Sequence, residues 1–284
     1  MPCAARKLVC LGFGYCAQAL GRAAGGEFRD IVGTARRAER ARTLVSDGFS
    51  VLPIDDPRLF DGATHILISA PPEASGDPVL AAWGDAIGGL PGVEWIGYLS
   101  TTGVYGDRGG GWVNEDDAPR PGEERSQQRL AAERAWLAFG EAYGMPVHIF
   151  RLAGIYGPGR HVLDRLRDGT ARRIVKPGQV FSRIHVDDVA GTLRGSIARP
   201  KAGRIYNVAD DEPAAQADVV AFAAELLGIA PPPEEPFESA ELSPLARSFY
   251  SGCRRVRNDR IKRELGVALR YPTFREGLRS LALP

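Results

Sequence analysis

A glycine-rich turn near the N-terminus has the residue spacing of a phosphate-binding loop. Residues 12–17 read GFGYCA, which is the pattern G-x-G-x-x-A, and they follow a short apolar run at residues 8–11. The first glycine permits a tight bend, the second lets the backbone approach a pyrophosphate, and a small third residue lets a helix pack closely on a sheet. The N–H groups and the dipole at the start of that helix attract an anion. The pattern predicts a dinucleotide site at Gly12, Phe13, Gly14, Tyr15 and Cys16, with an ordinary glycine turn as the alternative.

The residues after the next predicted strand indicate which dinucleotide is bound. A site for NAD places Asp or Glu about 20 residues beyond the turn, where the carboxylate holds the ribose 2′-hydroxyl. Here Thr34 ends the strand, and Arg36 and Arg37 follow with no carboxylate beside them. A guanidinium pairs in a bidentate manner with a phosphate. We therefore predict NADP as the cofactor, and the alternative is that both arginines begin a solvated helix.

The order of the predicted elements is that of a doubly wound α/β fold. Short apolar runs predict strands, and the stretches between them predict helices. The strands are predicted at residues 8–11, 28–34, 49–54, 65–70, 95–100, 147–152 and 203–208, and the helices at 15–24, 38–47, 79–90, 124–143 and 215–227. This alternation predicts a parallel Rossmann sheet of at least six strands with the cofactor across their carboxyl ends. At those ends we also expect Ala70, Pro71 and Ser100 to line the cofactor.

The C-terminal half is less regular, and it predicts a smaller lobe that binds the substrate. We assign residues 1–153 and 183–208 to the NADP-binding Rossmann domain. Residues 154–182 and 209–284 are assigned to the smaller lobe. Within the latter, the proline-rich stretch at 231–236 predicts a rigid loop.

The composition excludes several classes of protein. Of the 284 residues, 44% are hydrophobic and 25% are charged, which is ordinary globular composition and excludes a disordered chain. The formal net charge of +1 is far below that of a nonspecific nucleic-acid binder, and no apolar run approaches the ~18 residues of a membrane span. The cysteines at 3, 10, 16 and 253 include no C-x-x-C pair. We therefore predict neither a disulfide framework nor a metal site, and a reduced, cytoplasmic location.

Four later segments resemble the extended short-chain dehydrogenase/reductase superfamily, as in NAD-dependent epimerase/dehydratases. They are residues 99–106 (LSTTGVYG), 151–159 (RLAGIYGPG), 184–190 (IHVDDVA) and 206–210 (YNVAD). The resemblance implies that Thr101 hydrogen-bonds the reacting oxygen of a substrate, and Tyr105 is the nearest phenol that could serve as an acid. The alternatives are a satisfied hydroxyl at a strand end for Thr101 and a structural role for Tyr105.

The chain departs from that superfamily at the pair of residues that transfers the proton. The usual pattern is Y-x-x-x-K-x-x-x-E, and aligning its last residue with Glu133 puts Arg125 at the tyrosine position and Arg129 at the lysine position. An arginine, with a pKa above about 12, cannot exchange protons near neutrality. Together with the G-x-G-x-x-A turn in place of G-x-x-G-x-x-G, this departure resembles the atypical branch of the superfamily. We predict that Arg125 and Arg129 bind a ribose, a phosphate or a substrate carboxylate, and the alternative is surface charge.

Two other groups of residues have both a functional and a structural interpretation. His185 faces the substrate cleft in many relatives, and the alternative here is a helix cap, with Asp187 and Asp188 in the first helical turn. The basic run from Arg254 to Arg263 lies where extended relatives hold a nucleotide diphosphate, whereas the residues alone favour a solvated helix face.

These observations predict an NAD(P)-binding, epimerase/dehydratase-like oxidoreductase. Its substrate would be a small or nucleotide-sugar-like molecule, expected to be anionic, and the protein would be a monomer or homodimer that binds neither nucleic acid nor membrane. The alternative is a noncatalytic NADP(H)-binding sensor or scaffold protein, which the loss of the Tyr–Lys pair favours. A polar, shielded pocket beside the nicotinamide position would favour the enzyme, and a flat open surface would favour the sensor.

Overall fold

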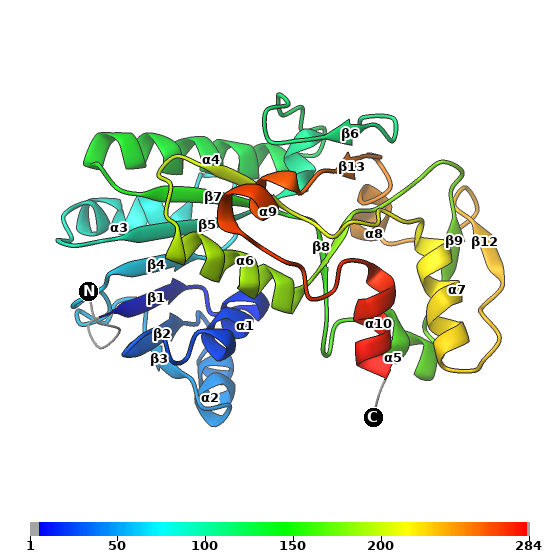
Figure 1. Ribbon diagram of the computed structural model, residues 1–284, viewed down its shortest axis with the longest axis horizontal. Helices are drawn as coiled ribbons and strands as arrows, with labels where there is room; N and C mark the ends of the chain where they lie inside the picture. The colour runs from blue at the N-terminus through cyan, green and yellow to red at the C-terminus, as the bar shows by residue number, and fades with distance from the viewer. Residues whose placement is uncertain (1–5, 283–284) are drawn as a thin grey trace.

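The largest element of the molecule is a parallel sheet of seven strands (Figure 1). The computed structural model describes residues 6–282. The strands lie in the order β11-β7-β5-β4-β1-β2-β3, and all neighbours are parallel. Their bounds are β1 (Lys7–Leu11), β2 (Asp30–Thr34), β3 (Ser50–Leu52), β4 (His65–Ile68), β5 (Trp95–Thr101), β7 (Val147–Leu152) and β11 (Ile205–Val208). The predicted parallel sheet of at least six strands is confirmed.

Helices cover both faces of this sheet because the strand residues are apolar on both sides. In β1, Leu8 and Cys10 pack in the cluster that includes α1 and α6, whereas Val9 and Leu11 pack in the cluster that includes α3 and α4. The helices are α1 (Tyr15–Ala23), α2 (Ala38–Ser46), α3 (Pro78–Gly88), α4 (Glu124–Tyr143) and α6 (Val186–Ala198). The strand order reverses between β4 and β1, and a doubly wound sheet binds its ligand in the crevice at such a point.

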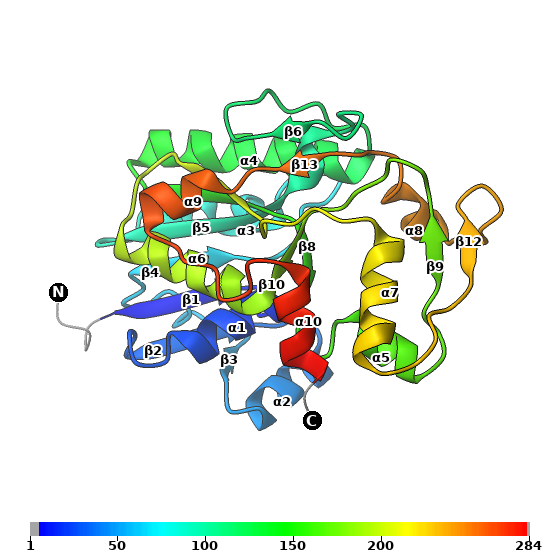
Figure 2. The ribbon, with the colours of Figure 1, turned by 45° about the vertical axis from the view of Figure 1, so that its right-hand side comes forward.

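A second group of elements lies beside the sheet, at the right of Figure 1, and is turned forward in Figure 2. Its helices α5, α7 and α10 pack on one another around Leu163, Val220 and Phe274. The short strands β8 and β10 form one parallel pair, and β9 and β12 form another. The bounds are β8 (Gly154–Tyr156), α5 (Val162–Arg167), β9 (Arg173–Val175), β10 (Arg183–His185), α7 (Gln216–Leu226), β12 (Glu234–Pro236), α8 (Pro244–Ser248) and α10 (Phe274–Ala282).

Part of the C-terminal region returns to the first lobe. Strand β13 (Arg255–Val256) pairs with β6 (Trp112–Val113) in the long loop that follows the single-turn helix η2 (Thr102–Tyr105). Helix α9 (Asp259–Leu265) packs against α6 and β11. Residues 255–265 therefore lie on the Rossmann lobe, although the sequence interpretation places them with residues 209–284.

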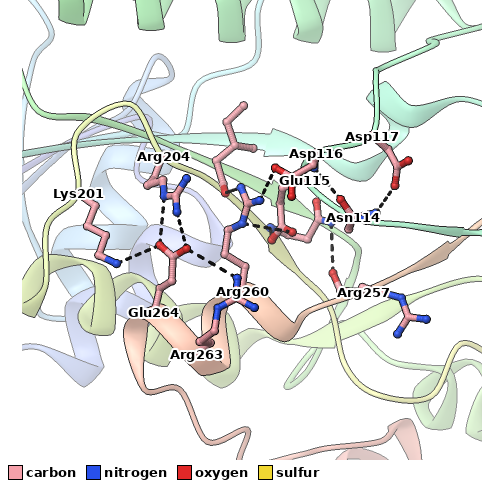
Figure 3. A network of polar contacts seen from close by, with 12 residues as sticks. Asn114, Glu115, Asp116, Asp117, Lys201, Arg204, Arg257, Arg260, Arg263 and Glu264 are labelled. Carbon is pink, nitrogen blue, oxygen red and sulfur yellow. Dashed lines mark hydrogen bonds and ion pairs between the residues drawn. The ribbon is translucent and has the colours of Figure 1, made fainter.

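One arginine of the C-terminal basic run is buried in this return segment, which corrects the prediction of a solvated helix face at that position, whereas Arg257 and Arg263 are exposed as predicted. Arg260 is buried, and its guanidinium lies 2.6 Å from Asp116 and 3.7 Å from Glu115 of the long loop (Figure 3). On the same helix, Glu264 accepts from Arg204 at 2.6 Å. Ion pairs to distant acids, rather than water, therefore satisfy the charge of Arg260.

None of the helices within residues 6–282 is long and apolar enough to cross a membrane. Three cysteines in this range, Cys10, Cys16 and Cys253, carry free thiols, while Cys3 lies outside the described residues.

Candidate functional site

The glycine turn after β1 is held in the conformation that a phosphate-binding loop requires. Gly12 has φ +86°, and a Cβ there would lie 2.9 Å from the backbone nitrogen of Ala70. The N–H of Gly12 donates to Oγ1 of Thr34 at 3.0 Å, and the N–H of Phe13 donates to the carbonyl of the same threonine at 2.8 Å. Thr34 is buried and ties the turn to the end of β2. Only glycine fits position 12, because any side chain would combine a strained backbone with a steric clash.

The turn leads into α1 with open N–H groups. Gly14 is the N-cap, and its carbonyl accepts the first helical hydrogen bond, from Gln18. The N–H groups of the first three helical residues, Tyr15 to Ala17, therefore have no acceptor within the helix. No acidic residue lies in this first turn. These features fit the diphosphate of a dinucleotide, which such a helix N-terminus attracts through its dipole and free donors.

The side chains of Phe13 and Cys16 point away from this anion position. Phe13 is 3% exposed and packs edge-on against Phe49, over the face of Gly33. Cys16 is buried, and burial raises the pKa of its thiol to about 11. Phe13 and Cys16, like the two glycines of the turn, can therefore contact a ligand only through their backbone atoms.

Arg36 and Arg37 lie in solvent beyond the end of β2. Arg37 is the N-cap of α2, and Arg36 lies 3.5 Å from the carboxylate of Glu73. Glu73 belongs to the loop after β4, and the sequence analysis did not consider it. Pro71 of that loop is exposed and Ala70 is partly buried, with its N–H donating to the carbonyl of Leu11. The structure thus places one carboxylate beside Arg36, one of the two arginines expected to select NADP.

A cleft of ≈ 1180 Å³ opens at the carboxyl ends of β5 and β7. This volume exceeds the ~300–1,000 Å³ of common small-molecule pockets, so a nucleotide-sized molecule fits. The end of β5, the start of α4, residues 152–156 and residues 242–256 contribute to its wall. Because neighbouring strands are about 4.8 Å apart, the end of β5 lies about 10 Å from the turn after β1, two strands away. A dinucleotide that begins near β2 and crosses β1 would therefore reach the cleft.

Three of the four predicted catalytic residues line this cleft, namely Thr101, Arg125 and Arg129. The hydroxyl of Thr101 accepts from the N–H of Gly103 at 3.1 Å and still has its own proton to donate. Arg129 donates to the carbonyl of Leu99 at 2.8 Å, which fixes the guanidinium at the cleft wall. Arg125, one helical turn earlier, is exposed at the cleft.

Ser126 is a cleft residue that the sequence analysis missed. A Cβ built on Gly103 would lie 2.7 Å from the hydroxyl oxygen of Ser126 and 3.3 Å from that of Thr101. Both hydroxyls therefore border the position that a Cβ at residue 103 would occupy, which glycine leaves open. The signal was present in the sequence, because Ser126 directly follows the position where the family has its tyrosine.

Tyr105 and Ser100 lie behind the cleft, in a buried polar network. The hydroxyl of Tyr105 donates to Asn207 at 2.7 Å, and burial raises the pKa of its phenol. Ser100 donates to Glu133, which also forms an ion pair of 2.7 Å with buried Arg151. This placement favours the structural alternative for Tyr105, and it separates the hydroxyl of Ser100 from the cleft.

The cleft carries a clear excess of positive charge. Six arginines in its wall form no ion pair with any carboxylate of the described chain, and they are Arg125, Arg129, Arg160, Arg165, Arg183 and Arg254. The acidic lining residues are Asp107, Glu123 and Asp164. Burial lowers the pKa of Arg254, whose guanidinium donates to the carbonyl of Gly106. Unpaired guanidinium groups in a partly buried wall favour an anionic ligand.

His185 caps α6, which confirms the structural alternative for this residue. Its Nδ1 accepts from the N–H of Asp187 at 3.2 Å, so the neutral ring carries its proton on Nε2. Burial lowers the pKa of His185 to about 4. Asp187 and Asp188 both lie in the first turn as expected. Asp188 also accepts from the N–H groups of Arg270 and Tyr271 and so anchors a distant loop.

The sheet, the glycine turn and the cleft define a Rossmann-type α/β protein with its ligand crevice at the carboxyl ends of the strands. The sequence model of the NAD dependent epimerase/dehydratase family matches residues 80–209. Residues 80–209 are therefore similar to this family, and the whole chain shares the fold of its solved members.

Three comparisons illustrate the range of similarity. A functionally unknown conserved protein from Silicibacter pomeroyi is 49% identical, with 97% of both chains covered and a TM-score of 0.92. Protein YeeZ from Escherichia coli K12 is 31% identical over 176 residues, which are 62% of this chain and 58% of the relative. The match thus spans somewhat over half the length of that curated relative. The dTDP-glucose 4,6-dehydratase from Bacillus anthracis, solved in complex with NAD, is 17% identical with a TM-score of 0.79, covering 98% and 95% of the two chains, and it shares the fold.

Proposed function

We propose that this protein is an NADP-dependent oxidoreductase of the epimerase/dehydratase kind that acts on a small, anionic, nucleotide-sugar-like substrate. The observation that carries the proposal is the arginine-lined cleft at the carboxyl ends of β5 and β7. It opens at the same edge of the sheet as the glycine turn, so one extended cofactor can reach both. The solved relative that contains NAD supports a nicotinamide dinucleotide as the cofactor.

The residues just beyond the end of β2 would determine whether the protein prefers NADP or NAD. Arg36 and Arg37 follow Thr34 in solvent, where a 2′-phosphate could meet both guanidinium groups. When bound, the nicotinamide supplies hydride transfer. Glu73 beside Arg36 partly offsets the positive charge at this position, and its effect can be measured by substitution.

The residues in the cleft wall suit the binding and polarisation of a substrate oxygen. Thr101 can donate its hydroxyl proton in a hydrogen bond to that oxygen, and the hydroxyl of Ser126 lies nearby, on the other side of the Cβ-free position at Gly103. Arg125 and Arg129 would hold an anionic group of the substrate without transferring protons, because the guanidinium stays protonated at any pH in the working range. At the positions where the superfamily pattern has its tyrosine and lysine, this chain would therefore orient the substrate and supply positive charge without transferring a proton.

The alternative of a noncatalytic NADP(H) sensor is less well supported. A sensor needs no second ligand, whereas this cleft is large, polar in part and lined by unpaired arginines. We retain a cytoplasmic monomer or homodimer as part of the proposal, together with the division into a Rossmann lobe and a smaller substrate lobe.

Mass spectrometry of ligands tests the proposal directly. The protein is incubated with NADPH or NADP⁺ and a pool of metabolites, and retained or converted compounds are identified. We expect anionic compounds to be retained by the unmodified protein and to be lost from Arg125→Ala. Conversion that requires the cofactor supports the enzyme. Cofactor binding with no retained or converted compound supports the sensor, and binding of neither NADPH nor NADH contradicts both.

A further inference from the structure

A second segment, far along the chain from the glycine turn, also lies against the N-terminus of α1. Residues 157–160 form a tight turn in which Gly157 and Arg160 exchange backbone hydrogen bonds of 3.2 and 2.9 Å. The hydroxyl of Tyr15, the first residue of α1, donates to the carbonyl of Pro158 at 2.9 Å. This hydrogen bond joins residues 143 positions apart and holds the turn against the first residue of the helix.

The close approach of this turn depends on glycine. Gly157 has φ +150°, and a Cβ there would lie 2.7 Å from the hydroxyl of Tyr15 and 2.8 Å from Cγ1 of Val186. A side chain at this position would push the turn away from α1. The structure therefore holds the turn and the helix start at contact distance.

The turn carries a cation that forms no ion pair with the described chain. The guanidinium of Arg160 lies 5.9 Å from the ring centre of Tyr15, and the residue lines the large cleft. No carboxylate of the described chain forms an ion pair with Arg160, and its side chain is exposed. The cation therefore lies beside Tyr15, the first residue of α1, where its positive charge adds to that of the helix dipole.

A buried, unpartnered donor faces the same turn. His185 is 1% exposed, and its Nε2 has no hydrogen-bond partner within the described chain. This atom lies 3.4 Å from the Cβ position of Gly157. Because Nδ1 is the acceptor for Asp187, Nε2 carries the proton in the neutral ring. A buried polar atom without a partner is uncommon in a folded protein, and a bound polar ligand is one way to satisfy it.

We propose that Arg160 binds the diphosphate of the dinucleotide and that Tyr15 positions it for this purpose. The inference rests on the proposed function only in that a dinucleotide binds across the turn after β1. The diphosphate lies between the N–H groups of α1 on one side and the guanidinium of Arg160 on the other. Tyr15 contributes a backbone N–H to the first side and holds the second side in place through Pro158.

Titration calorimetry with separate parts of the cofactor tests the proposal. The probes are NADPH, NADH, ADP-ribose, which keeps the diphosphate, and adenosine 2′-monophosphate, which has none. We expect Arg160→Gln to weaken NADPH, NADH and ADP-ribose by about tenfold or more, because one charge-assisted hydrogen bond is lost. The same variant should leave adenosine 2′-monophosphate unchanged. Arg160→Lys keeps the charge without the bidentate geometry, so its affinity for the diphosphate probes should lie between those of the unmodified protein and Arg160→Gln.

Arg134→Gln is the matched control. Arg134 lies on α4 in solvent, outside the cleft wall, so the variant makes the same change of charge without touching the turn. It should bind every probe as the unmodified protein does.

A double-mutant cycle separates positioning by Tyr15 from a merely structural role. Tyr15→Phe removes only the hydroxyl that donates to Pro158, and we expect a loss of several-fold for the diphosphate probes. In the Arg160→Gln background the same change should have almost no further effect, because the residue that it positions is gone. Equal losses in both backgrounds would overturn the role given to Tyr15.

Binding measurements distinguish a failure of the proposed function from a failure of the role given to Arg160. If the unmodified protein binds neither NADPH nor NADH, the proposed function fails and this inference fails with it. If the unmodified protein binds them and Arg160→Gln binds as tightly as Arg134→Gln, only the role of Arg160 is overturned. An equal loss for adenosine 2′-monophosphate would also overturn it, because that probe has no diphosphate.

Discussion

Arg36 lies 3.5 Å from the carboxylate of Glu73, close to the end of β2, where the ribose of a dinucleotide is expected. Both side chains are more than half exposed. An ion pair of this kind contributes only about 0–1 kcal/mol, since water and salt screen it. A 2′-phosphate with two negative charges can therefore displace Glu73 from Arg36 at little cost.

We expect NADPH to bind at least about tenfold more tightly than NADH. The 2′-phosphate gains charge-assisted hydrogen bonds from Arg36 and Arg37, whereas a ribose hydroxyl gains little. The preference should shrink at high salt, because the site is exposed. Replacing both arginines by alanine should bring the two affinities together. Calorimetry of both cofactors measures this, and equal binding to the unmodified protein would mean that the arginines are ordinary surface residues.

Glu73→Gln should strengthen the preference for NADPH. The substitution frees Arg36 and removes a negative charge near the phosphate, so we expect NADPH to bind up to about fivefold more tightly. Binding of NADH should change little. Asp55→Asn, in the exposed loop after β3, serves as the control for a general change of charge. Tighter NADH in Glu73→Gln would show that the carboxylate does not select the cofactor in this way.

Arg125→Ala should weaken substrate binding roughly tenfold and leave the shape of the pH–rate profile unchanged. Arg125 lines the cleft and contributes charge, but a guanidinium does not titrate between pH 5 and 9. The measurement is kcat/KM against pH for a substrate found by the mass-spectrometry screen. Loss of one limb of the profile would contradict the assignment, because it would mean that Arg125 takes part in proton transfer.

Glu133→Ala should lower the free energy of unfolding by about 3–5 kcal/mol. The substitution leaves the guanidinium of Arg151 buried without its ion-pair partner, and it removes the acceptor of Ser100. Urea unfolding monitored by circular dichroism measures the loss. Glu141→Ala, at an exposed position of the same helix, should stay within about 0.5 kcal/mol of the unmodified protein. Similar stability of the two variants would refute the structural role of Glu133.

Stability should fall as the pH decreases from about 6.5 towards 4, in part because of His148. Burial lowers the pKa of His148 to about 4, below its value of about 6.5 in an unfolded chain. In this range the unfolded chain binds a proton that the folded chain rejects, since Nε2 of His148 accepts from the N–H of Lys201. Each such histidine can remove up to about 1.4 kcal/mol per pH unit. His148→Gln should show a shallower dependence, measured as the unfolding free energy at pH 7 and pH 5, and an unchanged slope would contradict this origin.

The regular part of the fold was predictable from the sequence because it depends on local signals. The helix predicted at 124–143 and the strand predicted at 147–152 are confirmed at both ends. Gly144, with φ +65°, ends the helix, and a continuous apolar run marks the strand. The helix predicted at 79–90 begins instead at Pro78, because Asp77 caps it by accepting from two backbone N–H groups.

The parts that the sequence did not predict depend on partners far along the chain. Arg260 looks like an exposed helical residue until Asp116, 144 positions away, is brought beside it. Strands β6 and β13 have two residues each, too few for any periodic pattern. In the site, Arg160 directly follows the segment YGPG, but only the folded chain shows that its turn lies on Tyr15. Residue types thus indicated the kind of site, and the tertiary contacts determined which charges face the ligand.

The pairing of β13 with β6 determines when the site can be completed during synthesis. The long loop before α4 emerges from the ribosome early, together with the glycine turn and most of the sheet. Its strand partner at residues 255–256 and the cation that pairs with Asp116 are made more than 140 residues later. A growing chain can therefore form most of the Rossmann sheet before the long loop has the partners that hold it in place beside the cleft. Substrate binding should appear only near the end of translation, after the cofactor turn has formed.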